Sequence, residues 1–325
     1  MVSLIDRYRE RLPVSADTRV VSLGEGSTPL LPAPSISRRL GVELYLKWEG
    51  ANPTGSFKDR GMTVAISKAL GGGASTVICA STGNTAASAA AYAARAGIVA
   101  VVLQPEGAVS SGKLAQARAL GARVLEVRGS FDEALAAARE LADRGTHVLV
   151  NSLNPDRLEG QKTAAFEIVE ELGSTPDVLA LPYGGGGNVT AYGRGFAESD
   201  GRPRLVAGEA AERRTTVASA IRIGTPAHAS TAAEALASSG GSAVSLADEA
   251  ILEAWRELAR DEGVFCEPSS AAGLAALGSV ELDRDSVVVC VVTGHGLKDP
   301  DTAARLSPEP VAVDPDPDAI AEASR

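Results

Sequence analysis

The chain of 325 residues contains few of the residue types that build metal centres and disulfide frameworks, with only three cysteines, three histidines and two methionines. Cys79, Cys266 and Cys290 are odd in number, widely spaced and not arranged as CxxC. Neither a disulfide framework nor a structural zinc site is therefore expected. The histidines also lie far apart in the sequence. We predict no metal site and expect a reducing compartment.

Long hydrophobic runs and an excess of positive charge are absent as well. No run of about 18 apolar residues occurs, so no membrane span is expected. Residues 1–11 are amphipathic and charged, without the apolar core of a signal peptide. The formal net charge is −10, whereas a face that binds nucleic acid is basic. These absences predict a cytoplasmic protein that uses neither a membrane nor nucleic acid as its partner.

Aromatic residues are scarce, at 4% of the chain, whereas alanine and glycine are abundant. The core is therefore expected to consist of small aliphatic side chains. Hydrophobic residues at 45% and charged residues at 22% are ordinary for a globular enzyme. The length is sufficient for two domains of ordinary size or one large domain.

From residue 76 onward, short apolar runs alternate with alanine-rich stretches of helical spacing. The expected strands are 76–80, 98–103, 123–127, 147–150, 178–181, 205–208 and 287–292. The expected helices are 84–96, 111–120, 131–144, 158–172, 187–197, 248–262 and 269–277. This alternation predicts an α/β fold with parallel sheets and crossover helices. Because the strands are continuously apolar, helices are expected on both faces of the sheets.

Two sheets are expected, because a polar junction at 151–155 interrupts the series of strands. We predict a small domain at 56–150 and a large domain formed by 1–55 together with 151–325. In open α/β sheets, ligands gather at the carboxyl ends of the strands. Ser81, Gly184 and Thr293 each follow an expected strand, which predicts a single cleft between the two domains.

One lysine has the setting of a reactive amine. Lys58 follows Gly55-Ser56-Phe57 and stands at the start of an apolar-periodic stretch, so it is expected near a helix N-terminus. The partial positive charge of a helix N-terminus disfavours the ammonium form and favours the neutral, nucleophilic amine. On composition alone, a surface lysine at a helix start is the commoner arrangement.

Two helix starts carry features suited to anions. Gly184, Gly185, Gly186 and Gly187 precede Asn188 and an expected helix. Consecutive backbone N–H groups at such a position bind phosphate, whereas the alternative is a flexible turn that nothing exploits. Asn84 begins another helix, where on physical grounds alone it is equally well an N-cap.

Thr293 and Arg157 are open to similar alternatives. Thr293 ends the most hydrophobic strand, and its hydroxyl suits either a local turn or a ligand. The planar guanidinium of Arg157 suits a phosphate, but an arginine after a loop is equally often on the surface.

Four motifs in this order carry a family resemblance. They are Asn-Pro-Thr-Gly-Ser-Phe-Lys-Asp-Arg at 52–60, Ser-Thr-Gly-Asn-Thr at 81–85, Gly-Gly-Gly-Gly-Asn at 184–188 and Thr-Gly-His-Gly at 293–296. Together they resemble the fold-type II family of pyridoxal-phosphate enzymes, and within it the threonine synthases. The resemblance covers about residues 24–300, and the four motifs together are far more specific than any one of them.

The resemblance implies roles for named residues. Lys58 would hold pyridoxal 5′-phosphate through an imine bond and move protons, Asn84 would meet the phenolic oxygen of the cofactor, and Thr293 its pyridine nitrogen. The glycine run 184–187 with Asn188 would hold the cofactor phosphate. The residues expected to bind the carboxylate and phosphate of the substrate are Ser81, Thr82, Thr85, Asn151, Ser152 and Arg157. The family is commonly dimeric, which implies a homodimer.

The implied reaction converts O-phospho-L-homoserine and water to L-threonine and phosphate. Three positions depart from the threonine synthase pattern: Gly185 and Thr225 stand where Asn is usual, and Ala108 where Lys is common. Two alternatives therefore stay open within the enzyme class, namely β-replacement of the cysteate synthase type and a serine or threonine dehydratase. A third alternative is a non-catalytic protein that binds the cofactor on the same fold.

Overall fold

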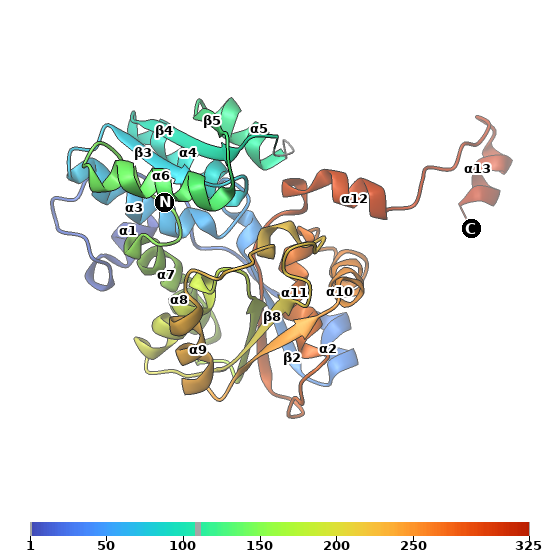
Figure 1. Ribbon diagram of the computed structural model, residues 1–325. Coiled ribbons are helices and arrows are strands. Elements are labelled where there is room, and N and C mark those ends of the chain that lie inside the picture. The colour runs from blue at the N-terminus through green and yellow to red at the C-terminus, as the bar shows by residue number, and fades with distance from the viewer. Residues whose placement is uncertain (1, 108–111, 325) are drawn as a thin grey trace.

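The computed structural model describes residues 2–107 and 112–324 as an α/β molecule with two sheets (Figure 1). The larger sheet has the strand order β1-β2-β10-β7-β8-β9 and the smaller one β5-β4-β3-β6. Their bounds are β1 Leu30–Pro32, β2 Glu43–Trp48, β3 Thr76–Ala80, β4 Val99–Pro105, β5 Arg123–Val127, β6 Val148–Leu149, β7 Val178–Pro182, β8 Arg204–Ala210, β9 Ser242–Leu246 and β10 Val287–Val292. Neighbouring strands are parallel except for β1 and β2, which are antiparallel.

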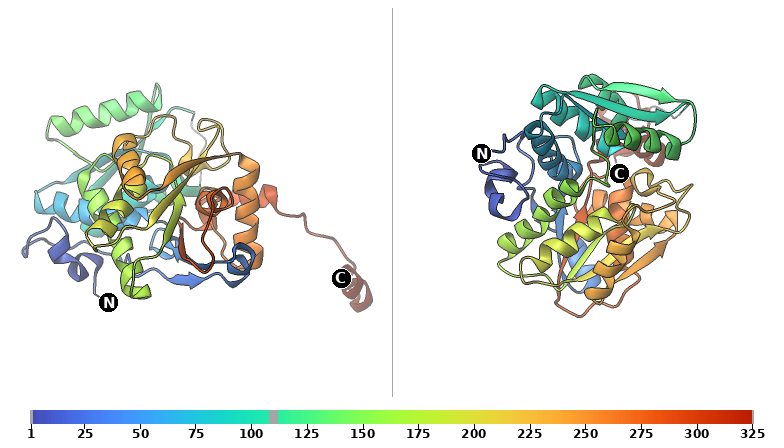
Figure 2. Two further views of the ribbon diagram at one scale, coloured as in Figure 1. Left: turned by 90° about the horizontal axis from the view of Figure 1, so that it is seen from below. Right: turned by 60° about the vertical axis from the view of Figure 1, so that its left-hand side comes forward.

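Helices cover the sheets on both faces (Figures 1 and 2). The α-helices are α1 Leu4–Arg7, α2 Pro34–Leu40, α3 Lys58–Gly71, α4 Asn84–Ala96, α5 Gly112–Ala119, α6 Phe131–Asp143, α7 Pro155–Leu172, α8 Gly187–Ala197, α9 Ala229–Ser238, α10 Asp248–Asp261, α11 Ala272–Leu277, α12 Pro300–Leu306 and α13 Pro317–Ala323. The 3-10 turns are η1 Arg9–Arg11, η2 Glu49–Ala51, η3 Ser219–Ile221, η4 Pro268–Ala271 and η5 Gly296–Lys298.

The two predicted sheets and their parallel strands are confirmed. Strands β3, β5 and β10 and helices α4 and α8 begin and end where the sequence places them, and the other expected elements differ by a few residues. All residues of β7 are buried, as its apolar run requires. Strands β1, β2 and β9 were not predicted. Because β2 pairs with β10, part of the N-terminal region belongs to the larger sheet. The exact domain limits stay a prediction.

The core consists of small side chains, as the composition suggests. Helix α4 buries a nearly continuous run of alanines against the smaller sheet. The three cysteines are free and buried, and act as small apolar residues within the core. Burial raises the pKa of both Cys79 and Cys290 to about 12.

Two glycines allow α3 and α7 to cross at close range. A Cβ added to Gly160 would lie 2.0 Å from the backbone oxygen of Arg60. A Cβ on Gly61 would lie 2.5 Å from the backbone oxygen of Arg157. Side chains at either position would separate the helices. The crossing therefore brings the helix that begins with Lys58 against the helix that carries Arg157.

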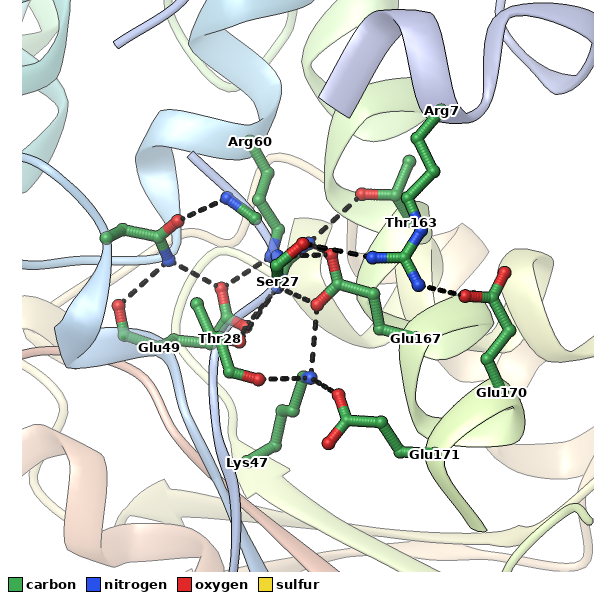
Figure 3. A network of polar contacts seen from close by, with 12 residues as sticks. Arg7, Ser27, Thr28, Lys47, Glu49, Arg60, Thr163, Glu167, Glu170 and Glu171 are labelled. Atoms are coloured by element: carbon green, nitrogen blue, oxygen red, sulfur yellow. Dashed lines mark hydrogen bonds and ion pairs between the residues drawn. The ribbon is translucent and has the colours of Figure 1, made fainter. Parts of the chain in front are cut away.

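A buried network of charges joins the same two helices to β2 (Figure 3). The Arg60 guanidinium donates to Glu49 on one side, with Nε to Oε2 at 2.7 Å, and to Glu167 on the other, with Nη2 to Oε2 at 2.6 Å. Lys47 Nζ lies 3.1 Å from Glu167 Oε2 and donates to the carbonyl of Thr28 at 2.7 Å. These charges are nearly inaccessible to solvent, and they hold α3, α7, β2 and the N-terminal segment in one arrangement.

The C-terminal segment extends away from the body of the molecule (Figures 1 and 2). Neither α12 nor α13 contains a buried residue. Within the described parts of the chain, no helix is both long and apolar enough to cross a membrane.

Candidate active site

A cavity of about 670 Å³ lies at the carboxyl ends of strands from both sheets. Ser81 follows β3, Gly184 follows β7 and Thr293 follows β10, and all three line this cavity. The other predicted site residues on its wall are Lys58, Thr82, Asn84, Thr85, Asn151, Ser152, Gly185, Gly186, Gly187 and Asn188. Residues that are distant in sequence are therefore brought together as expected. Arg157 is not on the cavity wall.

Lys58 is the first residue of α3, as its sequence setting predicts. Its amine lies 4.1 Å from the ring centroid of Phe57. Removal from bulk water, followed by the nearby charge of Arg157, lowers the pKa of Lys58 to about 7, although Glu267 opposes this shift. Burial is therefore the main cause of the lowered pKa. A substantial fraction of the amine is neutral near pH 7, which is the form that nucleophilic and base chemistry requires.

The neighbour of Lys58 stabilises the loop before it. Asp59 accepts hydrogen bonds from Thr54, at 2.7 Å from the backbone nitrogen and 2.6 Å from Oγ1, and from Ser88 Oγ at 2.6 Å. Burial raises the pKa of Asp59 to about 6, against the effect of these bonds. On the other side of the loop, Lys298 donates to the Thr54 carbonyl at 2.8 Å. Asp59 therefore orients the loop that presents Lys58.

The tetraglycine run forms the turn into α8. Gly186 is the N-cap with a φ of +82°, and a Cβ there would lie 2.8 Å from the backbone oxygen of His228. The first N–H groups of a helix have no acceptor within the helix and are available to an anion. At Gly185 the nearest atom to an added Cβ is 3.5 Å away. Because 3.5 Å is an ordinary van der Waals distance, the Cβ of an Asn would fit at this position without displacing a neighbour.

Asn84 does not cap α4. Gly83 is the N-cap residue, and the Asn84 amide donates from Nδ2 to Glu267 Oε1 at 2.7 Å. Its Oδ1 has no hydrogen-bond partner in the described chain. The N-cap alternative is therefore wrong, and the side chain is directed to the wall of the cavity.

The Thr293 hydroxyl pairs with a second hydroxyl rather than closing a local turn. Thr293 Oγ1 lies 2.9 Å from Ser270 Oγ, which also accepts from the backbone nitrogen of Gly294 at 2.8 Å. Thr293 nevertheless lines the cavity. Ser270 thus fixes the position of the hydroxyl that the sequence singles out.

Arg157 is fully buried and does not line the cavity. Its Nη1 donates to the carbonyl of Val150 at 2.8 Å, whereas Nε and Nη2 have no partner in the described chain. Burial lowers the pKa of Arg157 to about 10. The surface alternative is therefore wrong. Its proposed contact with a substrate phosphate stays a prediction, which two free buried donors support.

Asn151 and Ser152 are partly engaged by the protein itself. The Asn151 amide pairs with the backbone of Ala80, accepting at 2.9 Å and donating at 2.8 Å. The Ser152 carbonyl lies 2.7 Å from Nε2 of His228, whose backbone nitrogen donates to Gly185 at 3.0 Å. His228 therefore links the glycine run to the segment at 151–152, a role that the sequence does not indicate.

Several residues of the cavity were not predicted. Glu267 contacts Asn84 and forms an ion pair with Lys113 Nζ at 2.7 Å. Lys113 is itself buried. Phe131, Asp132, Leu135, Gln161 and Arg214 also line the cavity. Of the three departures, Gly185 and Thr225 line it, whereas Ala108 lies outside the described residues.

Comparison with known proteins identifies the family. The model of a family described as pyridoxal-phosphate dependent enzymes matches residues 21–294. The chain is 50% identical over 320 residues to a threonine synthase of Halalkalibacterium halodurans, which covers 92% of this chain and 90% of that protein. It is 52% identical over 336 residues to a threonine synthase of Mycobacterium tuberculosis, with 96% and 93% covered.

The chain belongs to the threonine synthase family of pyridoxal-phosphate-dependent enzymes. Its fold is also that of maize serine racemase, with a TM-score of 0.77 at 21% identity, covering 94% of this chain and 97% of the racemase. The predicted fold-type II architecture is therefore confirmed.

The residues of the cavity fit the cofactor of this family. The cavity holds one amine of lowered pKa, a helix start with glycines at its anion-binding end, and a hydroxyl at the end of β10. Asn84 Oδ1 and Asn188 Nδ2 are buried polar atoms without partners in the described chain. Polar atoms left unpaired in a buried site are costly, which indicates that a polar ligand completes it.

Proposed function

We propose that this threonine synthase family member converts O-phospho-L-homoserine and water to L-threonine and inorganic phosphate. The observation that carries the proposal is the Lys58 amine of lowered pKa on the cavity wall, together with Arg157, which is close enough to affect that pKa and has two donors without partners in the described chain. Family membership at about half identity over nearly the whole chain supports the same activity.

We expect the cofactor to be held by Lys58, by the N–H groups of the glycine run 184–187 with Asn188, by Asn84 and by Thr293. Bound pyridoxal phosphate supplies an aldehyde that condenses with amines and a ring that accepts negative charge from the substrate α carbon. The expected partner of the pyridine nitrogen is the hydroxyl of Thr293. Because this hydroxyl is neutral, the ring would be a moderate acceptor of charge. Elimination and replacement reactions can proceed with a ring of this moderate charge-accepting strength.

Lys58 is the proposed proton carrier. Its amine takes the proton from the substrate Cα and then serves Cβ, because its pKa near 7 allows it to accept and return protons at neutral pH. One Cβ proton leaves, and the bond from Cγ to the phosphate oxygen breaks to release phosphate. Protons then return to Cγ and Cα, and the hydroxyl of water adds at Cβ. The overall change consumes one water and releases one phosphate.

Two positively polarised regions bind the two anionic ends of the substrate. The start of α4, with Ser81, Thr82 and Thr85, is suited to the carboxylate because a helix N-terminus favours negative charge. Arg157 is suited to the phosphate, with Asn151 and Ser152 beside it. Arg157 would thus distinguish a phosphorylated substrate from serine or threonine.

The test is a comparison of two products. Purified protein with pyridoxal phosphate is expected to release phosphate from O-phospho-L-homoserine and to form threonine, identified by chromatography. Ammonia release from L-threonine without phosphate release from phosphohomoserine would instead establish the dehydratase alternative. Cofactor absorbance that responds to substrate without any product would establish the non-catalytic alternative.

We further propose that the protein acts as a homodimer in the cytoplasm. The dimer is supported by the family, which is commonly dimeric, and the cytoplasmic location by the three free cysteines, which suit a reducing compartment. Light scattering at working concentration tests the dimer by giving twice the mass of the chain.

A further inference from the structure

Glu267 is a buried carboxylate with two partners on the wall of the cavity. It is only 1% exposed and immediately precedes η4. Its Oε1 accepts from Asn84 Nδ2 at 2.7 Å, and its Oε2 lies 2.7 Å from Lys113 Nζ. A Cβ on Gly294 would lie 2.5 Å from Glu267 Oε1, so the chain leaves space for this carboxylate. The loop before η4, the start of α4 and α5 therefore meet in one arrangement of charge and hydrogen bonds.

The amide of Asn84 has two orientations of almost the same shape. One directs N–H groups and the other the carbonyl oxygen to a given neighbour, and only the hydrogen-bond partners decide between them. An ionised carboxylate can accept but not donate. Glu267 therefore pairs only with the NH₂ end of Asn84, which has a second N–H to offer to a ligand.

Lys113 supplies the positive charge that stabilises the buried carboxylate of Glu267. A buried carboxylate without a cation is costly. Lys113 is 4% exposed, so its charge faces Glu267 with little screening, and it also donates to Ser219 Oγ at 3.2 Å. The ion pair occupies Oε2 and leaves Oε1 to Asn84.

We propose that Glu267 is a positioning residue for the cofactor: anchored by Lys113, it fixes the Asn84 amide as a hydrogen-bond donor to pyridoxal phosphate. The inference depends on cofactor use by the family and not on which substrate is converted.

Substitution by glutamine gives a specific expectation. In Glu267→Gln, the ammonium of Lys113 attracts the new carbonyl oxygen and leaves the NH₂ end facing Asn84. The Asn84 amide then turns its carbonyl to that NH₂ group and loses its fixed donor orientation. If Lys113 is also replaced, the glutamine can turn its carbonyl back to Asn84. A second substitution is thus expected to repair the first.

The experiment measures the dissociation constant of pyridoxal phosphate by absorbance titration of cofactor-free protein, without substrate. Glu267→Gln is expected to weaken binding about 10-fold, the approximate worth of one hydrogen bond. Asn84→Ala is expected to weaken it similarly, with no further loss when Glu267→Gln is added. Adding Lys113→Met to Glu267→Gln is expected to recover part of the affinity. Glu25→Gln is the matched control, since Glu25 is a buried carboxylate bonded to Tyr92 and absent from the cavity wall.

Unchanged affinity in Glu267→Gln would overturn the inference. The inference would also be overturned if Glu267→Gln weakened cofactor binding by the same factor in the parent protein and in Asn84→Ala. Independent effects of that kind would mean that Glu267 has a general structural role. Should Glu267→Gln fail to fold by circular dichroism, Glu267→Asp takes its place in the same cycle. Since no substrate is used, a failed threonine synthase assay does not affect the result.

Discussion

At the scale of single residues, the chemistry rests on the environment of Lys58. The sequence predicts a helix start, and α3 does begin there, but burial has the largest effect on the amine. The positive charge of Arg157 on α7 lowers the pKa of Lys58 further, because the glycines at the α3–α7 crossing bring the two residues close. This contribution could not be predicted from sequence, since nearly a hundred positions separate the two residues.

The first prediction concerns Lys58 and pH. The folded pKa of about 7 lies below the ordinary value of 10.5, so between these values the unfolded chain binds more protons than the folded one. Stability due to Lys58 therefore rises with pH over this window, and its penalty is complete below pH 7. Cofactor-free Lys58→Met is expected to be more stable than the parent by roughly 4–5 kcal/mol at pH 6.5, at about 1.4 kcal/mol per pKa unit.

Urea denaturation of both cofactor-free proteins at pH 6.5, 8 and 9.5 checks this expectation. The advantage of Lys58→Met should shrink steadily as the pH rises. A difference in unfolding free energy that does not change with pH would mean that the amine is not held neutral in the folded state.

The second prediction concerns Arg157. Arg157→Met removes two charge-assisted donors that lack protein partners. We expect kcat/KM for O-phospho-L-homoserine to fall at least about 100-fold, since such bonds contribute about 1.5–3 kcal/mol each. Inhibition by inorganic phosphate is expected to weaken in parallel. Lys68→Met is the control, because Lys68 pairs with the neighbouring Asp156 at 2.6 Å but is 37% exposed. Full inhibition by phosphate in Arg157→Met would refute the phosphate contact.

At the scale of elements, the glycine run shows how backbone conformation determines a binding site. Gly186 needs its left-handed conformation to turn the chain into α8, and it also needs the absence of a side chain beside His228. The sequence predicts the anion site from the four glycines. The sequence does not predict that His228 contacts this glycine run, because no local pattern connects residue 228 to a loop about forty positions earlier.

The third prediction separates these two requirements. Gly186→Ala is expected to weaken pyridoxal phosphate binding at least 10-fold and to cost more stability than Gly173→Ala. The control glycine, Gly173, has a φ of +73° at the end of α7, and a Cβ added there has no atom within 4 Å among those around it. Gly173→Ala is therefore expected to cost only the left-handed strain of about 1–2 kcal/mol. Cofactor titration and urea denaturation of both variants provide the comparison. Equal losses of stability would show that contact with His228 is unimportant.

Regular elements were predictable where burial dictates their pattern. Strands covered on both faces are continuously apolar, so β3, β7 and β10 are recognisable from sequence. Strand β2 contains the charged residues Glu43 and Lys47, so it lacks the continuous apolar run by which the other strands were recognised. Lys47 is buried with Glu167, Glu171 and the Thr28 carbonyl as its partners, and such partnerships exist only in the folded chain. The contact of Glu267 with Asn84 was unpredictable for the same reason.

At the scale of the whole molecule, the network around Arg60 joins segments that would otherwise be independent. Burial alone would raise the pKa of Glu167, but Arg60 and then Lys47 bring it to about 2. The folded pKa is below the ordinary value, so this contribution to stability is present above pH 4.5 and is lost as pH falls towards 2. The network therefore stabilises the molecule throughout the neutral range.

The fourth prediction tests this network. Arg60→Met leaves Glu49 and Glu167 buried without the guanidinium between them, and such unpaired charges cost about 3–5 kcal/mol. Replacing Glu49 by Gln as well is expected to restore part of the loss. The exposed pair of Arg144 and Glu140 provides the control, and Arg144→Met is expected to cost less than about 1 kcal/mol. Equal unfolding free energies for the two single variants in urea would contradict the stabilising role of the network.

The most direct test of the whole account asks which nitrogen holds the cofactor. The protein is incubated with pyridoxal phosphate, reduced with borohydride, digested and mapped by mass spectrometry. The account predicts a single stable pyridoxyl adduct, on the peptide that contains Lys58, and none in Lys58→Ala. An adduct on another lysine, or no adduct in the parent protein, would contradict it.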